Sequence, residues 1–260
     1  MKRRLVTISI INSGQTWVEW KDQVIVMTAT ARGRVGSNLT EGPILQTLLT
    51  FAIPIVLTNL VQQLYSMVDL IVIGQFVGSV GTVGVNTGGE IMDMLTPVAV
   101  GFSTAGQIYI AQLVGAGDET NVKRAVGTLL TFMLGLSVII GVAVIGMSDL
   151  ILGWLNCPAE AWGQAKLYMI ITALGNPFVF GYNAVCGVLR GMGESKRPLL
   201  FIIVAAIVNI VLDLLLVTVI PLEAAGTAIA TASSQLGAFA AAFCFMWKKR
   251  EKFDFDLKLS

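Results

Sequence analysis

The sequence contains no histidine, the residue that most often serves as a general base or metal ligand near neutral pH. Its three cysteines, Cys157, Cys186 and Cys244, lie far apart and form no CxxC or other metal-ligand spacing, so we expect neither a metal centre nor a structural disulfide. Charged residues make up only 13% of the chain, against about a quarter in soluble domains. Together with a net charge of +1, these absences argue against an enzyme and against nucleic acid as a partner.

The sequence is instead rich in apolar residues. Hydrophobic residues make up 55% of the chain, and the mean hydropathy is +0.79. A membrane-spanning helix needs about 20 mostly apolar residues, and six segments are long enough. We expect spans near 48–74, 92–114, 126–155, 165–189, 199–220 and 224–247. The sequence therefore predicts an all-α integral membrane protein whose lipid-embedded part is a six-transmembrane-helix bundle.

The third of these segments is too long for one plain span. Ser148 and Asp149 are the polar residues nearest its far end, and we expect them to divide it into a membrane helix and an interfacial turn. The connection between the fifth and sixth spans, at Pro221, is very short.

Basic residues gather on one side of the predicted spans. Sixteen of the 17 Lys and Arg residues fall in the two terminal segments and in the second-to-third and fourth-to-fifth connections, and only Lys166 falls on the other side. Because positively charged loops stay in the cytoplasm, we expect a multi-pass protein of the cytoplasmic (plasma) membrane with both termini cytoplasmic. The expected organisation is a cytoplasmic N-terminal segment over 1–43, a transmembrane lobe over 44–247, and a basic cytoplasmic tail or linker over 248–260.

The first 26 residues differ in character from the rest. A basic start is followed by an apolar stretch of about seven residues, the short limit for a signal peptide, and no small-residue cleavage site follows. Met27 opens a segment typical of a short cytoplasmic leader. We therefore interpret Met1 as a misassigned start codon, with an interfacial or disordered arm as the alternative.

Two carboxylates lie inside otherwise apolar spans. Asp69 lies in the first span, and Asp213 lies in the fifth, one helical turn after Asn209. An ionised Asp at mid-membrane depth costs about 3 kcal/mol or more, so it normally faces a bundle interior or a wet cavity. The interior of the six spans holds no Lys, Arg or His, and Lys166 stands at the edge of the fourth. A proton, Na⁺ or a cationic solute would have to take the place of a basic partner, as in a coupled transporter.

Polar residues in the first span share one face of the predicted helix. Within about one third of its circumference lie Asn59, Gln62, Gln63, Ser66 and Asp69, with Tyr65 at the border. Pro54, upstream on the same helix, is expected to free a backbone carbonyl and to kink the span. The fourth span adds Asn176, Pro177, Tyr182 and Asn183. For Asn59, Gln63 and Asn176, an ordinary hydrogen bond between helices is an equal alternative to a role in a site.

Two further acidic residues, Glu90 and Asp93, stand at the predicted start of the second span. We expect them to be solvated in the outer interface. A contribution to an outer vestibule is the alternative.

Four segments of the chain resemble the multidrug and toxic compound extrusion (MATE) transporters. AIPIVLTNLVQQLYSMVDLIVIG, over 52–74, resembles the family's opening helix with its proline and acidic residue. LVGAGDETNVKRAVG, over 113–127, resembles the loop after the second helix, and LRGMGESKRPLLFIIVAAIVNIVLDLLL, over 189–216, resembles the fourth-to-fifth loop and fifth helix. AGTAIATASSQ, over 225–235, looks like the sixth helix. Together and in this order the segments are specific to the family.

The resemblance implies a cation-coupled antiporter that exports organic cations or amphipathic drugs. It assigns the proton- or Na⁺-binding role to Asp69, Asn209 and Asp213, and the surrounding cleft and hinge to Pro54, Gln62, Tyr65, Asn183 and Thr231. Thr231 enters only through the resemblance. No cofactor other than H⁺ or Na⁺ as the coupling ion is implied.

One departure from the family pattern leaves the assembly open. MATE transporters have about twelve helices in two lobes, whereas this sequence holds six predicted spans and resembles the N-terminal six-helix half. We favour a truncated product or fragment; a half-size transporter acting as a homodimer and one of two separately encoded halves are the alternatives. The partners expected are the lipid bilayer and either a second six-helix lobe or a second copy.

Two other functions compete with drug export. A non-transporting membrane subunit, or an inactive fragment, would need no coupled ion. A flippase for a lipid-linked precursor would also have an inner polar cleft, but such flippases usually carry basic residues to hold phosphate, and the spans here hold none in their interior. The buried acids therefore favour the antiporter over both.

Overall fold

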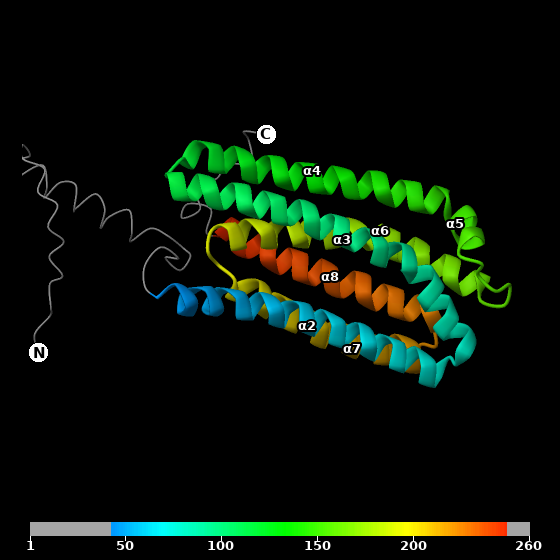
Figure 1. The fold of residues 1–260 in the computed structure, drawn as a ribbon. Coiled ribbons are helices and arrows are strands. Elements are labelled where there is room, and N and C mark those ends of the chain that lie inside the picture. Colours follow the sequence, from blue (N-terminus) through cyan, green and yellow to red (C-terminus); the bar gives the residue numbers. More distant parts are fainter. Residues whose placement is uncertain (1–42, 249–260) are drawn as a thin grey trace, which may run out of the picture. The chain divides into compact units, whose positions relative to one another are not determined.

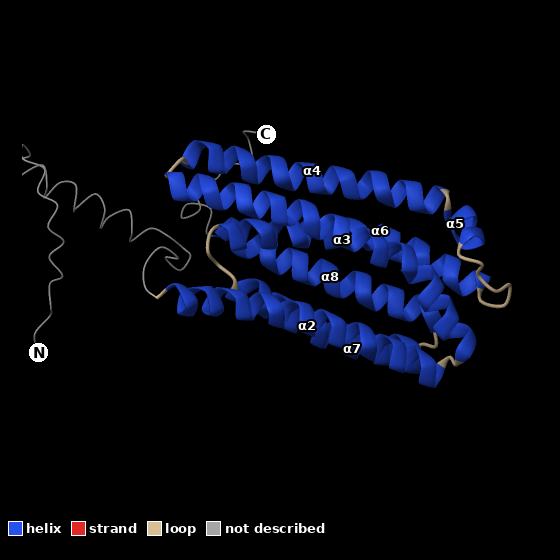
Figure 2. Ribbon diagram, viewed as in Figure 1, coloured by secondary structure: helices blue, strands red, loops and turns tan. Residues whose placement is uncertain are grey.

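The computed structural model describes residues 43–248, which Figure 1 and Figure 2 show as a helical bundle without a strand. The long helices are α2 (Ile44–Phe76), α3 (Ser79–Ala116), α4 (Glu119–Gly146), α6 (Trp162–Gly191), α7 (Lys196–Leu214) and α8 (Glu223–Lys248). The short α5 (Ser148–Trp154) lies between α4 and α6, and a π-helical turn, η1 (Leu215–Val219), continues α7. The predicted N-terminal segment and tail lie almost wholly outside the described residues.

The predicted fold class is confirmed. Six helices, with α7 and η1 counted together, are long and apolar enough to cross a membrane. The expected break in the third segment is also present, because α4 ends at Gly146 and α5 begins at Ser148. All three cysteines are unpaired in the described structure, with Cys157 and Cys186 buried.

The predicted start of the second span is wrong. Helix α3 begins at Ser79, 13 residues before the predicted boundary near 92, and runs for 38 residues. The segment 78–89 is rich in glycine, which indicates a turn when the sequence is considered alone. In the structure, Gly84, Gly88 and Gly89 instead form part of a helix surface that packs closely on α6. Small residues serve this purpose in membrane helices because they let two backbones approach.

Helix α6 lies at the centre of the bundle and is the most buried of the six spans. It packs against α3, α4 and α8, while α7 packs against α8 and α2 (Figure 1). A buried apolar cluster joins α6 to α3, α4, α7 and α8, with Phe180, Met133 and Ile202 among its fully enclosed side chains. Helix α2, in contrast, exposes apolar side chains along much of its length.

The contact between α3 and α6 is close enough to exclude side chains at several points. A Cβ added to Gly88 of α3 would lie 2.5 Å from the carbonyl oxygen of Ala165 in α6. Near the other end of the two helices, the glycines belong to α6 and the backbone opposite them belongs to α3. A Cβ on Gly187 of α6 would lie 2.8 Å from the carbonyl oxygen of Ser103, and one on Gly191 would lie 2.7 Å from that of Gln107. We call this contact, formed by these glycines and the backbone opposite them, the α3–α6 seam.

The two ends of the bundle differ in charge. Lys123 and Arg124, at the start of α4, and the basic residues around the α6–α7 connection lie at one end, the end at which α2 begins and α8 finishes (Figure 1). Lys166, near the start of α6, lies at the other end. The structure therefore places the basic connections at one end of the bundle, as the charge pattern predicts.

Helix α4 begins at this basic end with a capped turn. The carboxylate of Asp118 accepts hydrogen bonds from the backbone N–H of Asn121 at 3.1 Å and from its side-chain Nδ2 at 2.6 Å. Carboxylates are favoured at this position because they satisfy N–H groups that have no partner within the helix. These hydrogen bonds hold the pKa of Asp118 below its ordinary value.

Replacing Gly88 by Ala should destabilise the protein. The new methyl group would meet the Ala165 carbonyl oxygen at 2.5 Å, so the two helices would have to separate, at a cost of about 1–3 kcal/mol in the free energy of unfolding. Gly101→Ala, on the same helix but with no atom within 4 Å of the new Cβ, is the matched control. The midpoint of thermal unfolding in detergent should fall for Gly88→Ala and stay equal or rise for Gly101→Ala. Equal midpoints for the two variants would contradict the seam.

Candidate ion site and cleft

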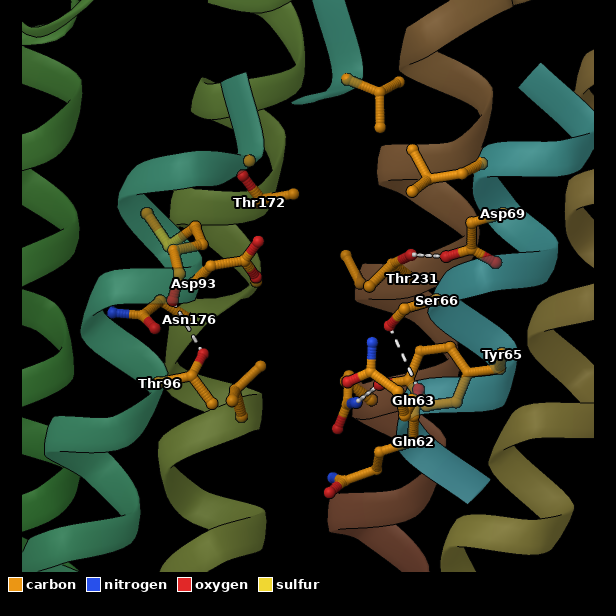
Figure 3. Close-up of a pocket in the computed structure, with 18 of the residues that line it drawn as sticks. Gln62, Gln63, Tyr65, Ser66, Asp69, Asp93, Thr96, Thr172, Asn176 and Thr231 are labelled. Carbon is orange, nitrogen blue, oxygen red and sulfur yellow. Dashed lines mark hydrogen bonds between the residues drawn. The ribbon is translucent and has the colours of Figure 1, made fainter. Parts of the chain in front are cut away.

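A polar cleft of about 620 Å³ separates two walls of the bundle (Figure 3). One wall is formed by α2 and α8, and the other by α3 and α6. The predicted polar stripe of α2 lines the cleft with Asn59, Gln62, Gln63, Tyr65, Ser66 and Asp69. The lining residues include no Lys or Arg, so the cleft presents carboxylate, amide and hydroxyl groups.

A chain of hydrogen bonds joins α7 to the two helices of the α2–α8 wall. The Nδ2 of Asn209, on α7, donates to the Oγ1 of Thr231, on α8, and that hydroxyl donates to the Oδ2 of Asp69, on α2. Both donor–acceptor distances are 3.4 Å, longer than the usual hydrogen-bond distance. Only 8% of the surface of Asp69 is exposed, and Asn209 is fully enclosed. The three helices are therefore linked by loose contacts around a buried carboxylate.

Asp213 lies one turn beyond Asn209 and is also fully enclosed. Neither of its carboxylate oxygens has a hydrogen-bond partner among the described residues, nor do the Oδ1 atoms of Asp69 and Asn209. The carboxyl groups of Asp69 and Asp213 lie close enough to interact electrostatically. Buried polar atoms are normally hydrogen-bonded, so four unpaired oxygens from three neighbouring residues mark a site suited to a cation or a proton. The π-helical turn η1 follows directly, as π-turns often do at functional sites.

The remaining residues expected around this site fall in two places. Tyr65 lines the cleft, and its hydroxyl accepts a hydrogen bond from Nε2 of Gln235 at 3.0 Å. Asn183 lies on the opposite wall, where its backbone carbonyl accepts from Ser103 Oγ at 2.6 Å. Pro54 is buried within α2 and is not among the residues that line the cleft. Of the predicted set, Asp69, Gln62, Tyr65, Asn183 and Thr231 line the cleft, whereas Asn209 and Asp213 lie behind its wall.

One acidic residue lies outside the solvated interface in which it was mainly expected. Asp93 was expected in the outer interface, but α3 begins at Ser79, so Asp93 is its fifteenth residue and lines the cleft. The same wall includes Thr96, Thr172 and Tyr168. The position of Asp93 could have been predicted if the glycine-rich stretch 78–89 had been assigned to the helix. That assignment places Asp93 within the span and not at its end. The other acidic residue, Glu90, is exposed and does not line the cleft.

The ion pair described in the bundle lies away from the cleft. Nζ of Lys166 is 2.7 Å from both carboxylate oxygens of Asp149, and this contact lowers the pKa of Asp149 below its ordinary value. Both side chains are substantially exposed, so the pair contributes little to stability. Lys166 therefore does not serve as the basic partner of the buried acids.

Comparison with known proteins identifies the family. The MatE family model matches residues 54–215. The chain is 31% identical over 202 residues to the "Probable multidrug resistance protein YpnP" of Bacillus subtilis (strain 168), a match that covers 78% of this chain and 45% of that protein. It is also similar in structure to a multidrug resistance MATE family transporter of the MOP superfamily in an outward-facing conformation, with a TM-score of 0.75 and 24% identity over 80% of this chain and 46% of that one.

A MATE structure in the bent conformation matches with a TM-score of 0.76 and 24% identity, over 81% of this chain and 47% of that chain. At these identities the structural likeness concerns the fold alone. The chain spans about half the length of the curated relatives it matches, consistent with the predicted N-terminal six-helix half. The family model covers more than half of this sequence. The resemblance noted in the sequence is thus confirmed, and the chain belongs to the MATE family.

Proposed function

We propose that this chain supplies the ion-binding lobe of a cation-coupled antiporter that exports organic cations or drugs. The observation that carries the proposal is Asp213, a carboxylate enclosed in a membrane bundle with both oxygens unpaired and with Asp69 beside it. Two neighbouring acids without a basic partner need a proton or a small cation between them. The names of the relatives, which include multidrug resistance and multidrug export proteins, support the same function.

The unpaired oxygens fit either coupling ion. Na⁺ is a hard cation and prefers carboxylate and amide oxygens, which Asp69, Asp213 and Asn209 provide. A proton would instead neutralise one carboxyl group and let it donate to the other. In both cases the buried charge falls, and the hydrogen bond from Thr231 to Asp69 changes strength. The two ions differ in their dependence on pH and salt, and that difference distinguishes them in solution.

Ion binding can act on the bundle because the site joins α2 to α7 and α8. Thr231 and Asn209 hold Asp69 through two long hydrogen bonds, so a change at the carboxylate alters how α2 is held. Coupling requires that the ion bind the outward- and inward-facing states with different affinity. Pro54 gives α2 a place to bend, because its ring nitrogen leaves the carbonyl of Thr50 without a helical donor. We infer that α2 moves about this point when the ion leaves.

The setting of the site follows from the charge pattern. With the basic end of the bundle in the cytoplasm, both termini of the lobe are cytoplasmic, and the protein lies in the plasma membrane. A second six-helix lobe, or a second copy of this chain, completes the transporter, since related proteins are about twice as long. The same fact favours the main alternative function, a non-transporting membrane subunit or inactive fragment. A lipid-precursor flippase is disfavoured, because none of the residues 43–248 that line the cleft is basic and able to hold phosphate.

Drug export should depend on the Asp213 carboxylate. In drug-sensitive cells that produce the full chain, we expect ethidium efflux that stops when the ion gradients are collapsed and falls to background in Asp213→Asn, because the amide cannot exchange a proton or neutralise a cation. Asp149→Asn, which removes an exposed carboxylate of the same type, should retain efflux. Continued gradient-driven efflux by Asp213→Asn would refute the coupling role. Absent efflux from well-inserted wild-type protein would favour the non-transporting alternative.

The same substitution should stabilise the isolated protein. An enclosed carboxylate without hydrogen bonds is costly, so Asp213→Asn is expected to raise the free energy of unfolding by about 1–3 kcal/mol at pH 8 without Na⁺. Adding Na⁺, or lowering the pH, should raise the midpoint of thermal unfolding of the wild type more than that of Asp213→Asn, which keeps only the Asp69 carboxylate, because a ligand stabilises only the state that binds it. A lower midpoint for Asp213→Asn than for Asp149→Asn would contradict this prediction.

Straightening α2 should slow transport without removing the ion site. Pro54→Ala restores a helical donor and removes a penalty of about 3 kcal/mol against a straight helix. We expect a lower initial rate of ethidium efflux, with the thermal stabilisation by Na⁺ or protons retained. An unchanged efflux rate at equal protein level would show that bending at Pro54 is not needed.

A further inference from the structure

Asp93 occupies the wall of the cleft that faces the ion site. It lies on α3, and Figure 3 shows its carboxylate directed into the space between the two walls, opposite the side that holds Asp69 and Tyr65. Its side chain is exposed to the cleft, and no hydrogen bond or ion pair to it is formed by another residue of the 43–248 region. Asp93 is thus an accessible negative charge inside a membrane span, where such a charge normally has a functional partner.

The backbone at Asp93 lacks its usual helical hydrogen bond. Pro97 lies four residues later in α3 and has no N–H group, so the carbonyl oxygen of Asp93 has no helical donor. The preceding carbonyl, of Met92, is instead occupied by the hydroxyl of Thr96 at 2.8 Å. Asp93 therefore offers a carboxylate, and a carbonyl that lacks the usual helical donor, on the same wall as Pro97, which also lines the cleft.

The opposite wall also carries a hydrogen-bond acceptor that has no donor among the described residues. Gln235 is 5% exposed and lines the cleft, and its Oε1 has no hydrogen-bond partner among the described residues. Its Nε2 is already engaged with the hydroxyl of Tyr65. The aromatic rings of Tyr65 and Tyr168 line the same space, and the Asp93 carboxylate lies close enough to interact electrostatically with both tyrosines. Aromatic faces and carboxylates together are the groups that recognise large organic cations.

Accessibility separates Asp93 from the ion site. Asp213 is completely enclosed and does not line the cleft, so only a proton or a small ion can reach it without a rearrangement of α2, α7 and α8. Asp69 lines the cleft but exposes only 8% of its surface, whereas Asp93 is exposed. Asp93 faces a space of about 620 Å³, within the size range of sites that hold drug-sized molecules. The two acids therefore suit ligands of different size.

We propose that Asp93 binds the positively charged centre of the transported substrate, a bulky organic cation, at a position separate from the ion site of Asp69 and Asp213. The substrate's role in export rests on the proposed function, but binding itself does not require transport. A charged contact in a partly wet cleft is expected to contribute about tenfold to affinity. Neutral molecules of the same size would not gain this contribution.

The test is direct binding of radiolabelled tetraphenylphosphonium to the purified full chain in phosphatidylcholine nanodiscs, with empty discs subtracted. Asp93→Asn should weaken binding about tenfold. Glu90→Gln is the matched control: it removes the same charge one turn away on α3, from a side chain that does not line the cleft. Asp93→Glu should restore most of the affinity, and equal elution volumes in gel filtration should accompany all three variants.

Three results would overturn the assignment: no binding by the wild type, equal weakening by Asp93→Asn and Glu90→Gln, or full affinity in Asp93→Asn. The proposed function fails separately. If tetraphenylphosphonium binds in an Asp93-dependent way while cells producing the chain show no gradient-driven efflux, the substrate site stands and the transport function of this chain falls. Stabilisation of Asp93→Asn by Na⁺ or protons, as in the wild type, is also expected, because the substitution leaves Asp69 and Asp213 intact.

Discussion

A carboxylate in hydrocarbon must be shielded from lipid, and this constraint organises the α2–α7–α8 side of the bundle. Asp213 is enclosed, and Asp69 of α2 lies close enough to interact with it. Asp69 is in turn linked by hydrogen bonds to Thr231 of α8, and through Thr231 to Asn209 of α7. None of these groups carries a positive charge, so shielding is achieved without neutralisation. The helices are held together at this point by long hydrogen bonds around unsatisfied oxygens. A ligand of these oxygens would therefore change how firmly the three helices are joined.

The other side of the bundle is held by a different kind of contact. Along the α3–α6 seam, backbone meets backbone, and there is no space for the side chains that would let one helix adjust against the other. The cleft lies between these two sides, and so between a tightly packed wall and a loosely held one. Asp93 and Asp69 stand on different walls, so their separation depends on how the two sides are placed. In the proposed mechanism, ion binding at the α2–α8 wall would therefore also alter the proposed substrate site, whose groups lie on both walls.

Much of the proposed ion site could be predicted from the sequence because its residues obey helical periodicity. The polar stripe of α2 and the pair Asn209 and Asp213 are visible as soon as the spans are treated as helices. The break before Ser148 was likewise foreseeable. Thr231 was not, because a single threonine in an apolar helix has many ordinary uses, and only the resemblance to a family distinguished it. That Asp69, Thr231 and Asn209 share one hydrogen-bonded chain depends on three helices meeting, which no local pattern encodes.

The position of Asp93 was missed for a different reason. Glycine is read as a turn signal in soluble proteins, whereas in a membrane it also permits close helix packing, and local sequence does not distinguish the two. Treating 78–89 as a connection shortened α3 and moved Asp93 to a helix end. The partner that makes these glycines helical is α6, whose Ala165 lies 77 residues from Gly88 in the sequence. Such long-range packing becomes visible only in the folded chain.

The α3–α6 seam also has a consequence for how this protein can diverge. At Gly88, Gly187 and Gly191 even one methyl group would collide with the backbone opposite, so every residue type other than glycine is disfavoured at these positions. Most of α2, in contrast, presents apolar side chains outward, where Leu, Ile, Val and Met are nearly interchangeable in lipid. Two chains can therefore differ at the great majority of their positions and still build this bundle. Among the positions compared, the glycines of the α3–α6 seam are therefore the ones at which the fold tolerates least change.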